Sequence, residues 1–233
     1  MKKSIAFLIM ALAISPLVSS QNNGVLSAHF ENYYQQMKAQ GDVQGIISAL
    51  THLNLLSPSD ARKDTLAAYY MNDNKHIQAL NTIGIEVDEN DSMLAVEIKA
   101  ISLQALGQNE LALAQFEKLF LKQPNPAIAY EIADLKIQSD DLTGARMKIT
   151  YGLANSTDEM MHTYYDTQQP YQVSQKSAFT YLEGILIFRE NPETNIDKAI
   201  AKLEIALASD PNFNLAAISK NALISRKEQQ IKE

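Results

Sequence analysis

One side-chain pattern returns about every 33 residues along this 233-residue chain, and it limits the folds open to the sequence. Three series of positions carry mostly small or apolar residues, and a fourth series marks a break inside each repeat. The series are Tyr34, Ala67, Ala100 and Ala133; Ile46, Ala79, Ala112 and Ala145; Leu50, Ile83, Phe116 and Ile149; and, at the break, Gly41, Asn74, Gly107 and Asp140. A repeat of this length predicts stacked supersecondary units rather than a single wound core.

The first 20 residues have the pattern of a secretory signal peptide. Lys2 and Lys3 precede an apolar run over 5–14, and Pro16 and Ser20 follow it. A membrane anchor is the alternative, but ten apolar residues reach only about half of the ~30 Å hydrocarbon core. We therefore expect cleavage after Ser20 and a mature chain over 21–233, periplasmic or secreted, with no membrane insertion.

Composition excludes two classes of partner and one source of stability. The chain has no cysteine, so neither disulfides nor a lipid on cysteine is possible, and packing between neighbouring repeats must provide the stability. Removing Lys2 and Lys3 changes the formal charge from −7 to −9. An acidic protein has no electrostatic attraction to nucleic acid or to an anionic membrane surface, and we expect neither as a partner.

Each repeat is predicted to contain two helices, as the third repeat shows. Apolar residues at helical spacing predict one helix over 94–106 and another over 111–121. Gly107 is expected to end the first helix in the left-handed conformation, and Asn109 to cap the second. Pro124 and Pro126 then end the repeat and start the next one.

This arrangement resembles the tetratricopeptide repeat (TPR) family. Ala100 and Ala112 occupy the family's two small positions, Phe116 its large apolar position and Pro124 its terminal proline. The family's frequent tryptophan is absent, and Gly152 departs from the pattern in the fourth repeat.

The resemblance implies an all-α, TPR-like α-solenoid of about five antiparallel helix pairs with a C-terminal capping helix, all in one domain over 21–233. The repeats are expected at about 27–58, 60–92, 93–125, 126–157 and 176–211, followed by the capping helix over 213–231. Such a capping helix gives the last repeat a polar outer face.

An insertion over about 158–175 interrupts the rhythm. The distance from Ala145 to Ala199 is 54 residues instead of 33, so about 20 residues are added there. The insertion contains Tyr164, Tyr165 and Tyr171. Insertions in solenoids often lie on the binding face, and tyrosine suits recognition. Two roles remain open: these rings contact a partner, or they cover the seam between two repeats.

No catalytic, cofactor or metal site is expected. The four histidines lie in different parts of the chain, and no serine has the setting of an activated nucleophile. Asp158, His162 and Asp166 are spaced four apart, on one face of a possible helix, but a fourth zinc ligand is missing. We therefore expect a non-enzymatic protein.

The resemblance implies that the first helix of each repeat lines a concave surface. Carried over position by position, this surface consists of Glu31, Gln35, Lys38, Met71, Asn72, Glu97, Gln104, Tyr130, Asp134, Gln138, Tyr181 and Arg189. One matching series reads Glu31, Asp64, Glu97, Tyr130 and Tyr181, which argues against a clamp for a partner's carboxylates. An acidic, amide- and tyrosine-lined surface favours a neutral or basic extended segment.

The sequence thus predicts a scaffold or adaptor of the cell envelope that binds a protein or peptide. The expected contact residues are Glu97, Gln104, Tyr130, Asp134, Gln138, Tyr164, Tyr165, Tyr171, Tyr181 and Arg189. The alternative is a receptor for a small ligand or a glycan, with a pocket under the insertion.

Overall fold

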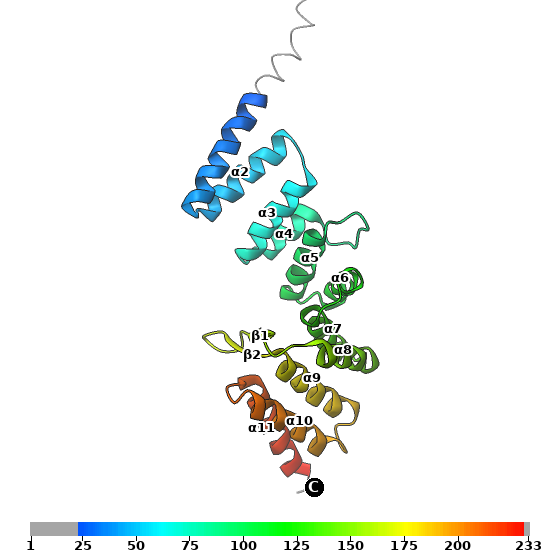
Figure 1. Cartoon of the computed structure of the whole chain (residues 1–233). Helices are drawn as coiled ribbons and strands as arrows, with labels where there is room; N and C mark the ends of the chain where they lie inside the picture. Colours follow the sequence, from blue (N-terminus) through cyan, green and yellow to red (C-terminus); the bar gives the residue numbers. More distant parts are fainter. Residues whose placement is uncertain (1–22, 231–233) are drawn as a thin grey trace, which may run out of the picture. The chain divides into compact units, whose positions relative to one another are not determined.

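The computed structural model describes residues 23–230, and most of them are helical (Figure 1). The signal peptide predicted over 1–20 lies outside the described residues. Residues 23–40 form a helix, and the helices after it are α2 (Val43–Leu56), α3 (Asp60–Asn72), α4 (His76–Ile83), α5 (Met93–Ala105), α6 (Asn109–Lys122), α7 (Pro126–Gln138), α8 (Leu142–Asn155), α9 (Gln175–Glu190), α10 (Ile196–Ser209) and α11 (Asn214–Gln230). No helix within 23–230 is long and apolar enough to cross a bilayer.

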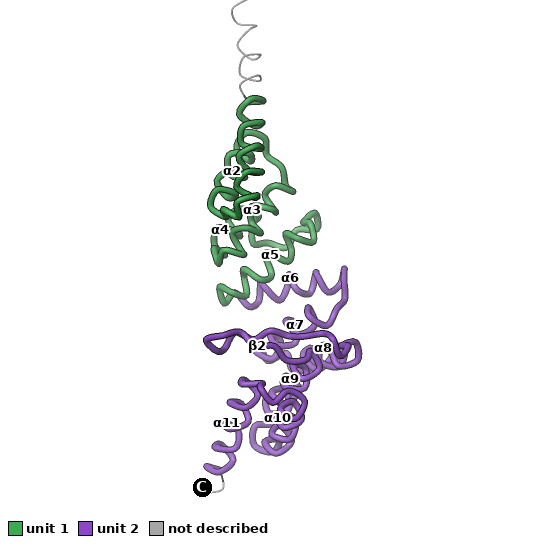
Figure 2. Tube along the Cα trace, turned by 60° about the vertical axis from the view of Figure 1, so that its left-hand side comes forward, with its two compact units in different colours: residues 1–107 green, residues 108–233 purple. Residues whose placement is uncertain are grey.

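The residues fall into two compact units, Met1–Gly107 (unit 1) and Gln108–Glu233 (unit 2) (Figure 2). Unit 1 contains α2 to α5, and unit 2 contains α6 to α11. The predicted third repeat, 93–125, contributes α5 to one unit and α6 to the other. The single domain predicted over 21–233 stays a prediction.

The predicted break between paired helices is visible in the backbone. Gly41, Asn74, Gly107 and Asp140 have φ angles of 70°, 56°, 70° and 66°. This left-handed conformation is easy for glycine and accessible to asparagine and aspartate, whose short polar side chains tolerate it. Four turns of one geometry therefore occur at the predicted spacing.

The small residues of the repeat are buried where the helices of a pair meet. Ala67 and Ala79 in unit 1, and Ala133 and Ala145 in unit 2, have no exposed surface. An alanine at each position lets two helix backbones approach, and larger side chains such as Ile149 fill the space beside them. The predicted all-α, TPR-like solenoid is confirmed.

Helix bounds agree with the prediction to within two residues in the third repeat, but one cap does not. Asn109 is the first residue of α6 and not its cap, and the preceding Gln108 makes no capping bond with its side chain. Instead, the Asn109 side-chain amide donates to Gln138 Oε1 over 2.8 Å. The prediction of an Asn109 cap is wrong because that side chain is used to link α6 to α7.

The insertion folds as a β-hairpin, which the sequence did not predict. Strands β1 (Met161–Tyr164) and β2 (Tyr171–Ser174) pair antiparallel, with Met161 opposite Ser174 and Tyr164 opposite Tyr171. The helical face suggested for Asp158, His162 and Asp166 is therefore wrong. In Figure 1 the hairpin lies between α8 and α9 in the chain and extends away from the helices of unit 2.

Candidate functional site

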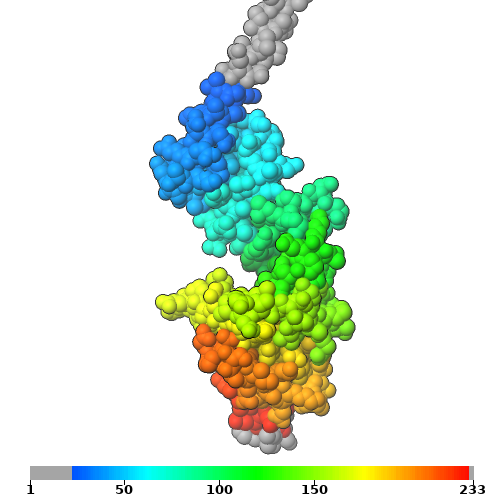
Figure 3. Space-filling view, viewed as in Figure 1, coloured from blue at the N-terminus to red at the C-terminus, as the bar shows by residue number. Residues whose placement is uncertain are grey.

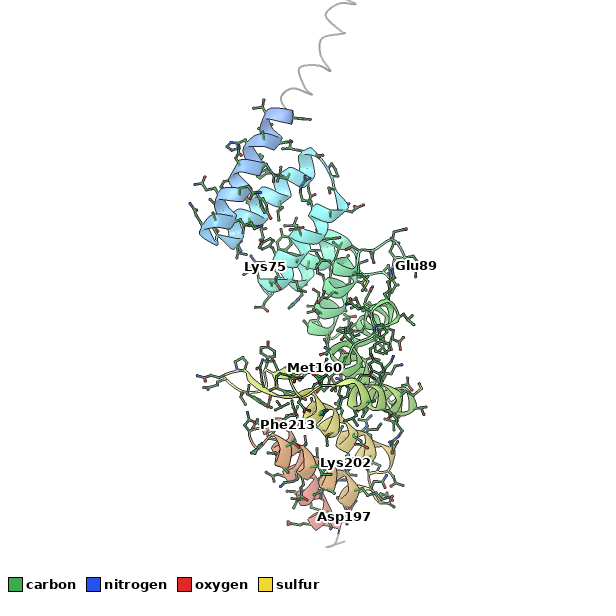
Figure 4. The ribbon with its side chains drawn as sticks, in the orientation of Figure 1. Lys75, Glu89, Met160, Asp197, Lys202 and Phe213 are labelled. Atoms are coloured by element: carbon green, nitrogen blue, oxygen red, sulfur yellow. The ribbon has the colours of Figure 1, made fainter. Side chains whose placement is uncertain are left out.

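One face of the hairpin packs against the helices of unit 2 through a cluster of rings. We call this the aromatic cluster; it consists of Tyr130, His162, Tyr164, Tyr171, Tyr181 and Phe213. The His162 ring lies 3.9 Å from that of Tyr130 on α7, and Tyr164 stacks on Tyr171 at 5.6 Å. Phe213, labelled in Figure 4 just before α11, contacts both Tyr164 and Tyr181. The cluster thus joins α7, α9 and the start of α11 to the hairpin.

Burial separates the predicted contact residues into two groups. Tyr130, Tyr164 and Tyr181 are only 5%, 7% and 9% exposed, so their rings are part of the core. Tyr171 is partly exposed, and its hydroxyl accepts a hydrogen bond from the Leu215 amide over 3.2 Å. Tyr165 is 77% exposed. For the three buried tyrosines the structure therefore shows the seam-covering role instead of an exposed contact surface.

The cluster is an environment that disfavours charge. Burial raises the pKa of Tyr130 and Tyr164 well above the ordinary tyrosine value, and it raises the pKa of Tyr171 to about 12. Burial lowers the pKa of His162 to about 4. The His162 ring is therefore neutral at pH 7 and packs as an aromatic side chain.

Asp134 is the exception, because it places a carboxylate beside these rings. It follows Tyr130 by one turn of α7 and accepts a hydrogen bond from Gln138 Nε2 over 2.8 Å. Burial raises the pKa of Asp134, and its charge contributes to the raised pKa of Tyr130, Tyr164 and Tyr181. In the described part of the chain, no lysine, arginine or histidine forms an ion pair with Asp134.

The remaining predicted residues are spread over both units. Gln138 and Arg189 are exposed at the carboxyl ends of α7 and α9, and Arg189 pairs with Asp140 over 3.2 Å. Glu97 and Gln104 lie on α5, in unit 1. The predicted residues that the structure brings together are Tyr130, Tyr164, Tyr171 and Tyr181 in the aromatic cluster, and Asp134 with its partner Gln138.

The residues considered for a metal site have separate partners. Asp158 pairs with Lys176 over 2.7 Å, Asp166 accepts from the Asn214 side chain over 2.8 Å, and His162 packs on Tyr130. Within 23–230 no group of three or more His, Cys, Asp or Glu residues is arranged to hold a metal ion.

The space under the hairpin is filled with side chains. Val173 and Phe213 have no exposed surface, and Phe179 and Tyr164 pack beside them. A cavity of about 370 Å³ lies in unit 1 between α3 and α5, and one of about 440 Å³ lies along the end of α11. Neither is lined by a residue of the insertion, so these cavities do not supply the pocket that a ligand receptor would need there.

Two contributors to this site were not among the predicted residues. His162 is not among the expected contact residues, although its position two residues before Tyr164 puts both side chains on one face of a strand. Asp210 accepts from the amide and the hydroxyl of Ser174 over 3.2 and 2.8 Å and holds β2 in place. The turn over 210–212 follows the last helix of the repeat predicted over 176–211.

Comparison with known proteins gives the fold and nothing finer. No family model and no curated protein sequence matches the chain. A tetratricopeptide repeat protein from Parabacteroides merdae has a similar solved structure, with a TM-score of 0.65 and 15% identity over 88% of this chain and 75% of that one. A TPR protein from Bacteroides fragilis is more distant, with a TM-score of 0.44 and 13% identity over 86% of this chain and 98% of that one.

Proposed function

We propose that this protein is a non-enzymatic scaffold of the cell envelope that binds an extended, neutral or basic segment of another protein. The TPR-like fold supports a binding role, since repeat solenoids offer extended surfaces for recognition. The signal-peptide pattern over 1–20 supports export, and the acidic composition supports a partner that is not itself acidic.

Asp134 is the observation that carries the proposal. Its side chain is partly buried, accepts a hydrogen bond from the Gln138 amide and forms no ion pair in the described part of the chain, and its charge contributes to the raised pKa of three tyrosines. A partly buried carboxylate without a cation is disfavoured in its charged form. A lysine or arginine from a partner would neutralise this charge.

Replacing Asp134 separates binding from folding. The pKa of Asp134 is raised by burial, so the fold disfavours its ionised form. Asp134→Asn is therefore expected to leave the melting temperature unchanged or to raise it. The same variant should retain less partner when the mature protein is used to capture proteins from an envelope extract.

Asp197→Asn is the matched control. This substitution removes one negative charge from α10, where Asp197 is exposed and pairs with Lys227. The control should capture the partner as the wild type does. Capture of no specific protein by the wild type contradicts the scaffold function, whereas equal capture by Asp134→Asn contradicts only the role of Asp134.

A further inference from the structure

We infer that the outer edge of β1 is a docking edge on which an extended segment of a partner, basic at its ends, adds a third strand to the hairpin. The inference rests on the proposed scaffold function and names the surface and the backbone groups that would bind. It follows from the register of the hairpin, from what covers each of its two edges, and from the charges at the ends of β1.

The register shows which backbone groups point outward. The Gln175 amide donates to the Met160 carbonyl over 2.8 Å, and these two residues continue the pairing of Met161 with Ser174. Hydrogen-bonded and non-bonded pairs alternate in an antiparallel ladder. His162 and Tyr164 therefore bond to β2, while the amides and carbonyls of Met161 and Thr163 face away from it.

The outer edge of β2 confirms this register and is covered. Ser174, opposite Met161, donates its amide to Asp210 Oδ2 over 3.2 Å. The carbonyl of Gln172, opposite Thr163, accepts from the Asn212 side chain over 3.4 Å. The turn over 210–212 thus supplies partners for one edge of the hairpin.

The edge of β1 has no such cover. In the described part of the chain, no hydrogen bond satisfies the outward amides and carbonyls of Met161 and Thr163. Lysine, proline and bulges often protect such an edge, and β1 contains none of these, so its short length of four residues is the protection that remains. Met161 and Tyr165 are 46% and 77% exposed at its two ends. The space-filling view shows the hairpin, in yellow, projecting from the surface of unit 2 (Figure 3).

Charge decides between a foreign segment and a second copy of the chain. Asp158 and Glu159 precede β1 and Asp166 follows it, and Lys176 offsets one of these three charges. Antiparallel pairing of β1 with β1 of a second copy would bring Glu159 close to Asp166 and oppose like charges. A segment with lysine or arginine at both ends meets opposite charges instead.

Amide hydrogen exchange tests the edge directly on the mature protein. In the free protein the amides of Met161 and Thr163 should exchange fast and those of His162 and Tyr164 slowly. The probe is a blocked peptide of alternating valine and threonine with two lysines at each end. At saturation it should slow exchange at Met161 and Thr163 by at least about tenfold. Unchanged exchange at these two amides at millimolar peptide overturns the inference.

Two proline variants give a matched pair. Thr163→Pro removes an outward donor from β1, and Gln172→Pro removes the outward donor of the residue opposite it on β2. Neither amide is used between the two strands. Thr163→Pro should weaken binding of the peptide by at least about tenfold, and Gln172→Pro by less than about twofold. Equal weakening contradicts docking at β1.

A peptide with glutamate in place of lysine should bind more weakly, and equal binding contradicts the charge argument.

The proteins captured from an envelope extract separate this inference from the proposed function. A partner held by the wild type and by Gln172→Pro but lost by Thr163→Pro supports both. A partner held equally by all three leaves the scaffold function standing and overturns the docking edge. A wild-type dimer in sedimentation that Thr163→Pro converts to monomer overturns it too, because a second copy would then occupy β1.

Discussion

The hydroxyl groups of Tyr130 and Tyr164 lie 2.7 Å apart and join a repeat helix to the inserted hairpin. Both rings are less than 10% exposed, so the bond lies in the interior of unit 2. The hairpin is therefore part of the packed structure, even though it interrupts the repeat. Any role in binding falls to its outer edge and its exposed end, and not to the rings of its inner face.

Tyr164→Phe should destabilise the protein while leaving the shape of the core intact. The substitution removes one hydroxyl and leaves that of Tyr130 without its partner in a buried place. We expect the free energy of unfolding, measured with urea, to fall by about 1–2 kcal/mol. Tyr165→Phe, at an exposed site, should change it by less than about 0.5 kcal/mol. Similar values for the two variants would contradict a structural role for the Tyr130–Tyr164 bond.

Stability should fall in mild acid because of His162. Burial lowers the pKa of its ring to about 4 in the fold, against an ordinary value of 6.5. The unfolded chain therefore binds the proton more readily, and this contribution is complete above about pH 6.5 and is lost as the pH falls toward 4. We expect a loss of up to about 3 kcal/mol in the free energy of unfolding between these two values.

His162→Phe provides the comparison for that titration. A neutral ring of similar size keeps the contact with Tyr130 but cannot take up a proton. The free energy of unfolding, measured with urea from pH 7 to pH 4, should fall less for the variant than for the wild type. Asp134 works in the opposite sense, since its raised pKa favours the fold at low pH, and it remains in both proteins. Parallel pH profiles would rule out His162 as the source.

Gly152→Ala should destabilise the protein. The same packing explains why glycine stands at 152, where the repeat pattern has another residue. A Cβ atom at Gly152 would overlap the ring of Phe179, which has no exposed surface. Overpacking of this kind costs about 1–3 kcal/mol, more than the ~1 kcal/mol that alanine contributes in a helix. We expect a lower melting temperature for this variant. Gly24→Ala, where the added atom meets nothing, should not lower it.

Lys99→Met should loosen the loop that follows α4. Lys99 is almost fully buried, and its ammonium group donates to Asp91 Oδ2 over 2.6 Å and to the Glu86 carbonyl over 2.8 Å. Removing one partner of a buried pair leaves the other charge uncompensated, at a cost of about 3 kcal/mol in the free energy of unfolding. Lys227→Met, which breaks an exposed pair with Asp197, should cost less than about 1 kcal/mol. Equal costs would contradict a structural role for the buried pair.

The helical repeat could be predicted because its determinants are local. Gly107 takes the left-handed backbone conformation at a turn, and the small side chains of Ala133 and Ala145 are buried where two helices meet. Each of these residues lies beside a helix that is within one repeat length in the sequence. Spacing in the sequence therefore reports directly on packing. Asp91 stands where the family pattern has proline, and its bond to Lys99 gives this departure a structural reason.

The candidate site could be predicted only in part because distant segments build it. The strands of the hairpin have four residues each, too few for an alternating pattern to stand out. The resemblance placed Tyr130 and Tyr181 on the concave surface, whereas both pack in the core of unit 2 with Tyr164 of the hairpin. Their burial could not be predicted from the repeat, because it depends on a segment outside the repeat.

The hairpin also changes how unit 2 is expected to fold. Contacts in a solenoid are mostly between neighbouring repeats, and folding can then spread from one repeat to the next. The bonds from Tyr171 to Leu215 and from Asp166 to Asn214 instead connect residues 44 and 48 positions apart. The last two helix pairs and α11 should consequently unfold in a single step, and a chain that ends before α11 should also lose the ordered hairpin.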